Sequence, residues 1–182
     1  MPHSQIQPPD IFHVTAAVGW LELGNATEAA AELDQLPAAT RSHPDVLEIR
    51  WQIHAARQEW DNCRQLALAL TDADPERTSG WINLAYAVRR ATGGSLEQAA
   101  EILTRVADKF PADLIIPFNL ACYHCQLGQL DAARQWLTTA FNRAIALNQL
   151  DSLRTMTLAE KDLEPLWQEM IRNPLWFPKK AD

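Results

Sequence analysis

A repeat with a period of about 34 residues limits this chain to a small number of possible folds. Four short segments share one pattern of small, polar and apolar residues. They end on the small residues Ala29, Cys63, Ala99 and Ala133, which are almost evenly spaced. Apolar or alanine residues follow four and seven positions later, the spacing of one face of an α-helix. These residues are Leu33, Ala67, Leu103 and Leu137, and then Leu36, Leu70, Val106 and Ala140.

An earlier helix is expected in each repeat. The apolar segment 81–88 begins six residues after Pro75, and segment 117–124 begins six residues after Pro111. Because proline ends one helix and suits the first turn of the next, these prolines mark repeat boundaries. The sequence therefore predicts a repeat made of a helix, a tight turn and a second helix. The residues expected to cap the second helices are Asn25, Ser95 and Asp131.

Over residues 10–147 this pattern resembles the tetratricopeptide repeat (TPR). The resemblance is strongest in the fourth repeat, where 119–123 reads Asn-Leu-Ala-Cys-Tyr and is similar to repeats common in bacterial TPR proteins. Segment 158–167 resembles the segment that caps such arrays. The resemblance implies an all-α fold: a right-handed superhelix (α-solenoid) of about four helix-turn-helix repeats plus C-terminal capping helices. A single domain, 1–182, is expected to comprise repeats at 10–43, 44–75, 76–111 and 112–147 and a cap at 148–182.

Three features depart from the family pattern. Arg41 stands where the family usually has proline, and Arg50 stands where leucine is expected. The third repeat carries two extra residues within 89–94. The fold prediction survives these departures because the first two repeats keep the period. In the cap, Trp167, Met170 and Ile171 are expected to cover the last repeat.

A concave groove lined by the first helices is what the resemblance implies as a binding site. Asn83 and Asn119 occupy the position where family members use an amide to hold the backbone of an extended peptide, since an amide both donates and accepts hydrogen bonds. The same amides could instead satisfy neighbouring backbone groups. Arg89 and Arg90 could clamp a carboxylate or complement a helix end. The expected peptide-binding residues are Ile82, Asn83, Tyr86, Arg89, Arg90, Ile115, Phe118, Asn119 and Cys122.

Charge and cysteine content argue against several other functions. Sixteen Lys and Arg against 23 Asp and Glu give a net charge of −7, which repels a phosphate backbone, so nucleic acid is not an expected partner. An odd number of cysteines, three in all, fits a reducing compartment. No apolar run is long enough to span a bilayer, and the N-terminus lacks the pattern of a signal peptide. We therefore expect a cytoplasmic protein without membrane insertion.

No catalytic centre, cofactor or metal site is expected. Cys122 and Cys125 have the spacing of a metal-binding pair, but a zinc site needs about four ligands, and the sequence has no second cysteine pair. Nucleotide-binding glycine fingerprints and nucleophile elbows are also missing from the sequence. We therefore expect a protein that is not an enzyme.

The expected function is that of a protein–protein interaction scaffold or adaptor, which holds a peptide or protein segment in the groove. Two alternatives stay open. One is a small cytoplasmic TPR chaperone for a secreted client, because small acidic TPR proteins of that type hold unfolded partners. The other is a self-associating structural module whose concave face is filled by its own segment 173–182, which leaves a homo-oligomer open.

Overall fold

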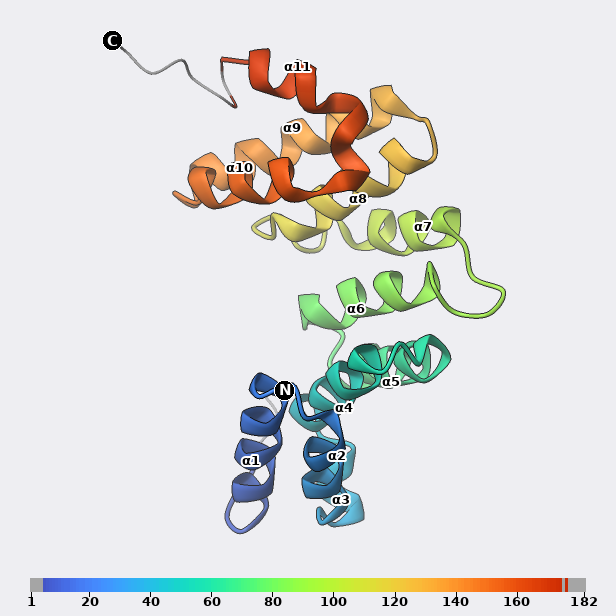
Figure 1. Cartoon of the computed structure of the whole chain (residues 1–182), viewed down its shortest axis with the longest axis vertical. Helices are drawn as coiled ribbons and strands as arrows, with labels where there is room; N and C mark the ends of the chain where they lie inside the picture. Colours follow the sequence, from blue (N-terminus) through green and yellow to red (C-terminus); the bar gives the residue numbers. More distant parts are fainter. Residues whose placement is uncertain (1–4, 175, 177–182) are drawn as a thin grey trace. The chain divides into compact units, whose positions relative to one another are not determined.

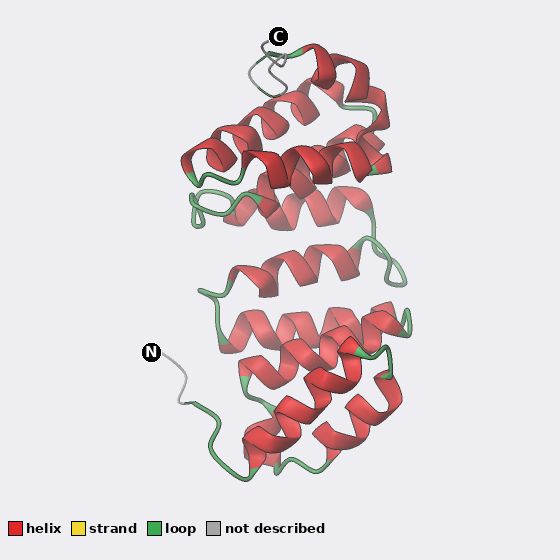
Figure 2. Cartoon of the chain, turned by 60° about the vertical axis from the view of Figure 1, so that its left-hand side comes forward, coloured by secondary structure: helices red, strands yellow, loops and turns green. Residues whose placement is uncertain are grey.

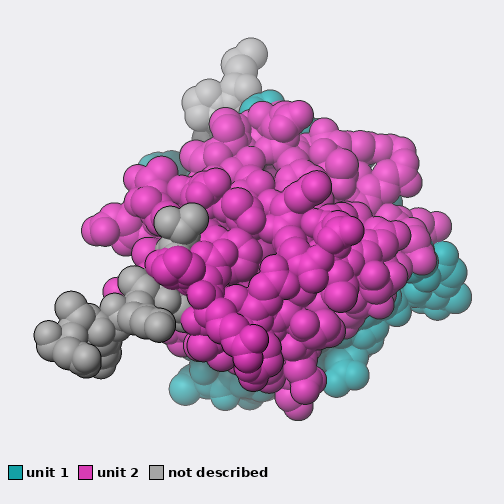
Figure 3. Space-filling model, turned by 90° about the horizontal axis from the view of Figure 1, so that it is seen from above, with its two compact units in different colours: residues 1–95 teal, residues 96–182 magenta. Residues whose placement is uncertain are grey.

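Helices account for all the regular structure in the described part of the chain. The computed structural model describes residues 5–174 and 176, and no strand occurs among them (Figure 2). The all-α prediction is therefore confirmed. The chain divides into two compact units, residues 1–95 (unit 1) and 96–182 (unit 2) (Figure 3). The division falls within the third expected repeat, between its two helices.

Unit 1 is built from helices that pack mainly against their neighbours in the sequence. In Figure 1 they are α1 (Asp10–Glu22), α2 (Ala26–Asp34), α3 (Ala38–Arg41), α4 (Pro44–Ala56), α5 (Trp60–Ala73) and α6 (Thr78–Val88). Helix α1 packs on α2, α4 on α5, and α5 on α6, while α2 also contacts α4. Packing between successive elements is the arrangement found in repeat proteins, whose stability is approximately a sum of neighbour interactions.

Unit 2 continues with helices of similar length and ends in shorter ones. They are α7 (Leu96–Val106), α8 (Ile115–Gln126), α9 (Leu130–Ala146), α10 (Leu150–Ala159), the 3₁₀ helix η1 (Lys161–Leu166) and α11 (Trp167–Arg172). Helix α8 lies at the centre, in contact with α7, α9 and η1. None of the helices in the described residues is long and apolar enough to cross a membrane.

The stripe that recurs in the sequence forms the interior of both units. Each of its twelve members is buried, and the small residues Ala29, Cys63, Ala99 and Ala133 have no exposed surface. A small side chain at this point lets two helices approach closely, and burial of the leucines contributes about 1.5–3 kcal/mol each. The residues that form the buried core therefore recur with the same period as the sequence repeat.

One type of turn joins four of the helix pairs. Between α9 and α10, the Gln149 N–H donates to the Ala144 carbonyl oxygen at 2.8 Å, the Asn148 N–H donates to the Ile145 carbonyl oxygen at 3.2 Å, and Asn148 has φ of 56°. The other three turns have the same geometry. In segments 20–25, 54–59 and 124–129, the sixth N–H donates to the first carbonyl at 2.8, 2.9 and 2.9 Å. The fifth N–H donates to the second carbonyl at 2.9, 3.0 and 3.0 Å, which completes a Schellman motif. The fifth residues Gly24, Gln58 and Gly128 have φ of 75, 58 and 71°, the left-handed region that this motif requires.

The predicted helix caps are confirmed in one case and wrong in another. The Asn25 side chain accepts a hydrogen bond from the N–H of Glu28 at 3.2 Å. Asp131 does not cap α9, because the preceding Schellman turn ends at Gln129, which is the N-cap residue, and the helix begins at Leu130. Asp131 lies in the first turn and pairs instead with Arg134 at 2.7 Å.

Arginines take over structural roles at two of the departures from the family pattern. Arg41 donates to the carbonyl oxygens of Leu36 at 2.7 Å and Asp34 at 2.8 Å. Arg50 donates to the carbonyl oxygen of Leu33 at 2.9 Å. These charge-assisted bonds satisfy the last carbonyls of α2 and complement the negative end of its dipole. The expected proline and leucine are thus replaced by two cations that bind the same helix end.

Two of the three residues expected to cover the last repeat are buried or hydrogen-bonded within unit 2. Met170 is fully buried, and the Trp167 indole N–H donates to the carbonyl oxygen of Thr157 at 3.1 Å. Ile171 is 51% exposed, so its predicted covering role is wrong; it faces away from the core one residue after Met170. The tail 173–182 lies largely outside the described residues. Trp176 is described, and its ring stacks on Phe141 with 5.0 Å between centroids.

Candidate functional site

Tyr86 and Arg90 are the two expected binding residues that the structure brings into direct contact. Tyr86 lies on α6 and is half-buried, and Arg90 follows four positions later, just past the end of the helix. The Arg90 guanidinium carbon lies 3.6 Å from the centroid of the Tyr86 ring. A cation held against the face of an aromatic ring gains about 0.5–2 kcal/mol, depending on how far it is desolvated.

Two tryptophans from other helices complete this group. The Trp51 ring of α4 lies edge-on to Tyr86 with 6.0 Å between centroids, and the Trp60 ring of α5 does so at 5.7 Å. Arg90 also lies over Trp60, 5.2 Å from its ring centroid. We call Trp51, Trp60, Tyr86 and Arg90 the aromatic–arginine cluster. It brings α4, α5 and the end of α6 together on one surface of unit 1.

The loop that carries Arg90 is fixed to α5 by hydrogen bonds. Asp61 accepts one bond from the Thr92 backbone N–H at 3.1 Å and another from the Thr92 hydroxyl at 2.8 Å. Arg64 donates to the Thr92 carbonyl oxygen at 3.2 Å. The Arg90 position is therefore held before any ligand binds, which lowers the entropic cost of binding.

A surface hollow of about 390 Å³ lies beside the cluster. Residues 58–62 line one side of it and residues 90–92 line the other. The hollow carries both signs of charge, since Glu59 and Asp61 face it together with Arg90. It therefore offers carboxylates, a guanidinium and an aromatic surface within one small area.

The neighbours of Glu59 lower the pKa of its carboxyl group below the usual value. It shares a short hydrogen bond with the Nδ1 atom of His54, and Asn62 donates to it at 3.3 Å. The bond with His54 is the main cause that lowers the pKa of Glu59. A similar arrangement occurs at the matching turn of unit 2, where His124 Nδ1 lies 2.6 Å from Gln129 Oε1. The turn in unit 2 therefore has the same histidine contact, but its partner is the uncharged amide of Gln129 instead of a carboxylate.

The remaining expected residues differ in how much surface they offer. Ile82, Asn83 and Arg89 are partly exposed in unit 1, as are Ile115 and Asn119 in unit 2. Phe118 and Cys122 are 5% and 3% exposed, so their side chains present almost no surface to a ligand. The expected groove draws on both units, and it stays a prediction.

Ile115 lines a second, smaller hollow in unit 2. Its volume is about 270 Å³, and the opposite side is formed by the segment that leads into α10 and by α10 itself. Leu147, Leu153 and Met156 make this hollow more apolar than the one beside the aromatic–arginine cluster. It lies where two successive first helices would meet in an array, but no charged side chain other than Asp113 lines it.

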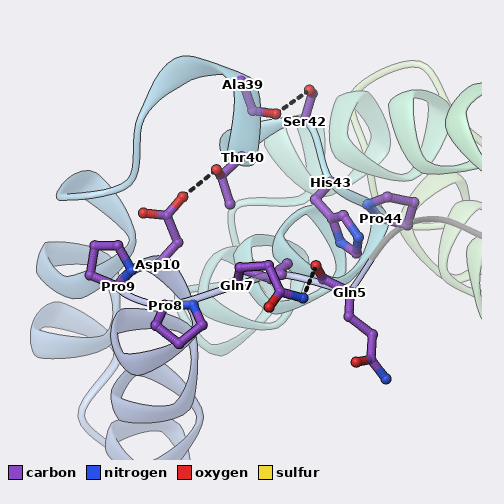
Figure 4. Close-up of a pocket in the computed structure, with 11 residues that line it drawn as sticks. Gln5, Gln7, Pro8, Pro9, Asp10, Ala39, Thr40, Ser42, His43 and Pro44 are labelled. Atoms are coloured by element: carbon purple, nitrogen blue, oxygen red, sulfur yellow. Dashed lines mark hydrogen bonds between the residues drawn. The ribbon is translucent and has the colours of Figure 1, made fainter.

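A third hollow lies between the N-terminal segment and the start of α4, and its volume is about 560 Å³ (Figure 4). Its polar groups are engaged locally. The Thr40 hydroxyl donates to Asp10, and His43 Nδ1 accepts from the N–H of Asp45 at 3.2 Å. These contacts attach the N-terminal segment to α3 and begin α4, so we regard this hollow as part of the scaffold.

The expected binding residues did not include Trp51 and Trp60. One signal was present: Trp51 occupies the position held by alanine in the other repeats, at Ala17, Ala85 and Ala121. A bulky ring at a position of close helix contact has to extend to the side, where it meets Tyr86. The cysteines do not contribute to the site. Cys63, Cys122 and Cys125 are buried, and they form no disulfide within the described part of the chain.

Comparison with known proteins leaves the chain without an assigned relative. No model of a known protein family matches the sequence, and no curated protein matches it either. Within residues 5–174 and 176, no group of three or more His, Cys, Asp or Glu side chains is placed to hold a metal ion.

Proposed function

We propose that this protein is an interaction module that binds a segment of another polypeptide, with the aromatic–arginine cluster as a principal contact. The observation that carries the proposal is the half-exposed Tyr86 ring, which is covered by the Arg90 guanidinium and flanked by two tryptophans. Arginine, tyrosine and tryptophan are the residues that most often dominate the energy of protein interfaces. The rigid attachment of the Arg90 loop favours binding for the same reason that preorganised interfaces bind tightly.

The make-up of the neighbouring hollow favours a polypeptide as the ligand. Glu59 and Asp61 on one side suit a basic side chain or a backbone N–H, while the rings of the cluster suit an apolar side chain. We propose further that the repeats form a right-handed superhelix of the TPR type. The regularly repeating buried stripe and the recurring Schellman turn support this architecture.

Selection from a display library of random peptides tests the proposed function. Peptides enriched on the purified chain are synthesised, and their dissociation constants are measured by fluorescence anisotropy. We expect Tyr86→Ser and Arg90→Gln each to weaken binding about tenfold or more, which corresponds to about 1.4 kcal/mol.

Two matched variants serve as controls for these substitutions. Leu158 is 42% exposed against 36% for Tyr86, so Leu158→Ser removes a similar apolar surface elsewhere. Arg105→Gln removes an exposed arginine that pairs with Glu101 on α7. Neither control should change affinity by more than about twofold. Enriched peptides that bind the Tyr86 and Arg90 variants as tightly as the wild type would show that the site is elsewhere.

A further inference from the structure

The outward side of α1 is an apolar helix face that no helix covers within residues 5–174 and 176. Phe12, Ala16, Gly19 and Leu23 follow at intervals of four, three and four residues, so they lie on one side of the helix. Phe12 is 66% and Leu23 76% exposed. No atom lies within 4 Å of the point where a Gly19 Cβ would be. We call these four residues the outer face of α1.

The repeat shows what covers this face elsewhere in the molecule. The equivalent residues of the next repeat, in α4, are Val46, Arg50, Ile53 and Arg57. Val46 and Ile53 are buried in one cluster with the stripe of α2. Arg50 and Arg57 each donate to a carbonyl oxygen of α2 at 2.9 Å. All four residues therefore contact the helix that precedes α4.

The same relation holds in later repeats. A Cβ on Gly80 of α6, which corresponds to Phe12, would lie 3.2 Å from the Leu70 side chain of α5. In unit 2, the corresponding residues Ile116 and Tyr123 of α8 are buried, and α7 packs against that helix. In each case the second helix of the preceding repeat covers the face. Among the described residues, no helix precedes α1.

Charge indicates which kind of helix would fit on the outer face of α1. Residues 1–40 contain five acidic residues and no lysine or arginine. The acidic residues are Asp10, Glu22, Glu28, Glu32 and Asp34. A second copy that used the same face would bring two acidic segments together, although Glu32 and Asp34 are paired with His13 and Arg50, and like charges disfavour such an interface. A basic helix would instead be complementary in charge.

We propose that the outer face of α1 docks a basic, amphipathic α-helix from a partner protein. The apolar side of that helix carries small residues and leucines at the spacing of Ala29, Leu33 and Leu36 on α2, which covers the corresponding face of α4. Gly19 allows the backbone of the docked helix to approach closely. This surface lies on α1 and does not involve the aromatic–arginine cluster, so the proposal stands independently of the proposed function.

A peptide copied from α2 provides the probe. It comprises residues 24–38 with Glu28→Lys, Glu32→Lys and Asp34→Lys. Ala31→Lys and Gln35→Asp, at exposed positions, supply the amine and the carboxylate that condense to a lactam and hold the peptide helical. The same lactam peptide with the native acidic residues is the matched control. Binding to the full chain is measured by fluorescence anisotropy. We expect saturable binding of the basic peptide that is about tenfold or more tighter than that of the acidic one and that weakens as salt rises from about 50 to about 500 mM.

Variants of the chain locate the binding surface. Phe12→Ser combined with Leu23→Ser, and separately Gly19→Leu, should each weaken the basic peptide about tenfold or more, the first by loss of apolar contact and the second by obstruction. Ile171→Ser, at a residue 51% exposed on α11, should leave the affinity unchanged. Circular dichroism checks that each variant remains folded.

Three results would overturn the proposal. The first is an absence of saturable binding up to about 1 mM peptide, because a dissociation constant weaker than this corresponds to only about 4 kcal/mol of binding free energy. The second is equal binding by wild type, the Phe12 and Leu23 double variant and the Gly19 variant. The third is a wild-type dimer, detected by sedimentation, that the double variant dissociates, because the occupant would then be a second copy of the chain.

Discussion

Two glycines show how different the constraints on single residues of this fold are. Gly19 lies within α1 with open space where a Cβ would be, whereas a Cβ on Gly94 would lie 1.7 Å from the carbonyl oxygen of Val88. Glycine costs about 0.5–1 kcal/mol in a helix interior relative to alanine. Gly19 thus lowers the free energy of unfolding of the unbound chain and leaves space on the outer face of α1.

Alanine substitution at the two glycines should have opposite effects. Gly19→Ala should raise the free energy of unfolding by about 0.5–1 kcal/mol. Gly94→Ala should lower it by about 1–3 kcal/mol, because the backbone near Val88 must move. Urea denaturation followed by circular dichroism measures both. A change of the same sign in the two variants would mean that the local geometry around one of them is wrong.

Cys63 should make the stability of the protein depend on pH above neutrality. Burial, with a smaller effect from Glu59, raises the pKa of its thiol from 9.0 to about 11. Between these values the unfolded chain loses the proton while the folded chain keeps it, so the free energy of unfolding should fall as pH rises from 9.0 to about 11. Cys63→Ala should reduce this slope.

The repeat itself supplies the reason that this variant should fold. Alanine occupies the corresponding positions 29, 99 and 133, so Cys63→Ala should change stability by less than about 1.5 kcal/mol. The native thiol should also react slowly with alkylating reagents at about pH 8, since the thiolate is the reactive form. Rapid labelling of native Cys63 would contradict the buried placement.

At the scale of the element, the turns between helices carry information that residue composition does not. The Schellman turns after α1 and α8 have glycine at the left-handed position, and the turn after α4 has Gln58 with φ of 58°. A residue with a Cβ costs about 1–2 kcal/mol in this conformation. The turn after α4 therefore forms against a local preference, supported by the packing of α4 on α5.

Exchanging residues between two equivalent turns tests this cost. Gln58→Gly should raise the free energy of unfolding by about 1 kcal/mol, and Gly128→Gln should lower it by a similar amount. Thermal and urea denaturation of the two single variants measure the effects. If neither variant changes stability, the backbone at these turns is not left-handed as described.

The helices were predictable from the sequence because their signal is local. Residues 29, 33 and 36 and their counterparts in the other repeats recur about every 34 residues, and all of these residues are buried. The candidate site was only partly predictable, because contacts between helices decide it. Tyr86 and Arg90 share α6 and its end, but Trp51 and Trp60 reach them from α4 and α5.

Helix α8 shows that a position in the repeat does not by itself predict whether a side chain is exposed. A count along the repeat places Phe118 and Cys122 on the groove side, but α8 packs against α7, α9 and η1, and eight of its 12 residues are buried, these two among them. The contact with η1 comes from the segment that follows α10, which has no counterpart in the repeat. A position in the repeat therefore predicts the helix face, and the neighbouring elements decide whether that face is accessible.

At the scale of the whole molecule, order along the chain largely determines which elements touch. Within unit 1 and within unit 2, most contacts link helices that are close in sequence. Charge is also distributed by position, because segment 1–40 holds five acidic residues and no lysine or arginine in a chain of net charge −7. Separate stretches of such a chain can therefore present different surfaces, which is the basis of what we propose for the aromatic–arginine cluster and the outer face of α1.

If successive repeats are equivalent and interchangeable, the chain should tolerate the removal of one whole repeat length. Deletion of residues 30–63 joins Ala29 to Arg64 and keeps the register, since Ala29 and Cys63 are equivalent positions of successive repeats. Deletion of residues 30–46 removes half that length and breaks the register. Hydrogen exchange of the α1 amides, followed by mass spectrometry, reports whether α1 still has a packing partner. We predict protection of α1 in the first variant close to that of the wild type, and rapid exchange in the second. Equal loss of α1 protection in both variants would contradict the equivalence of the repeats.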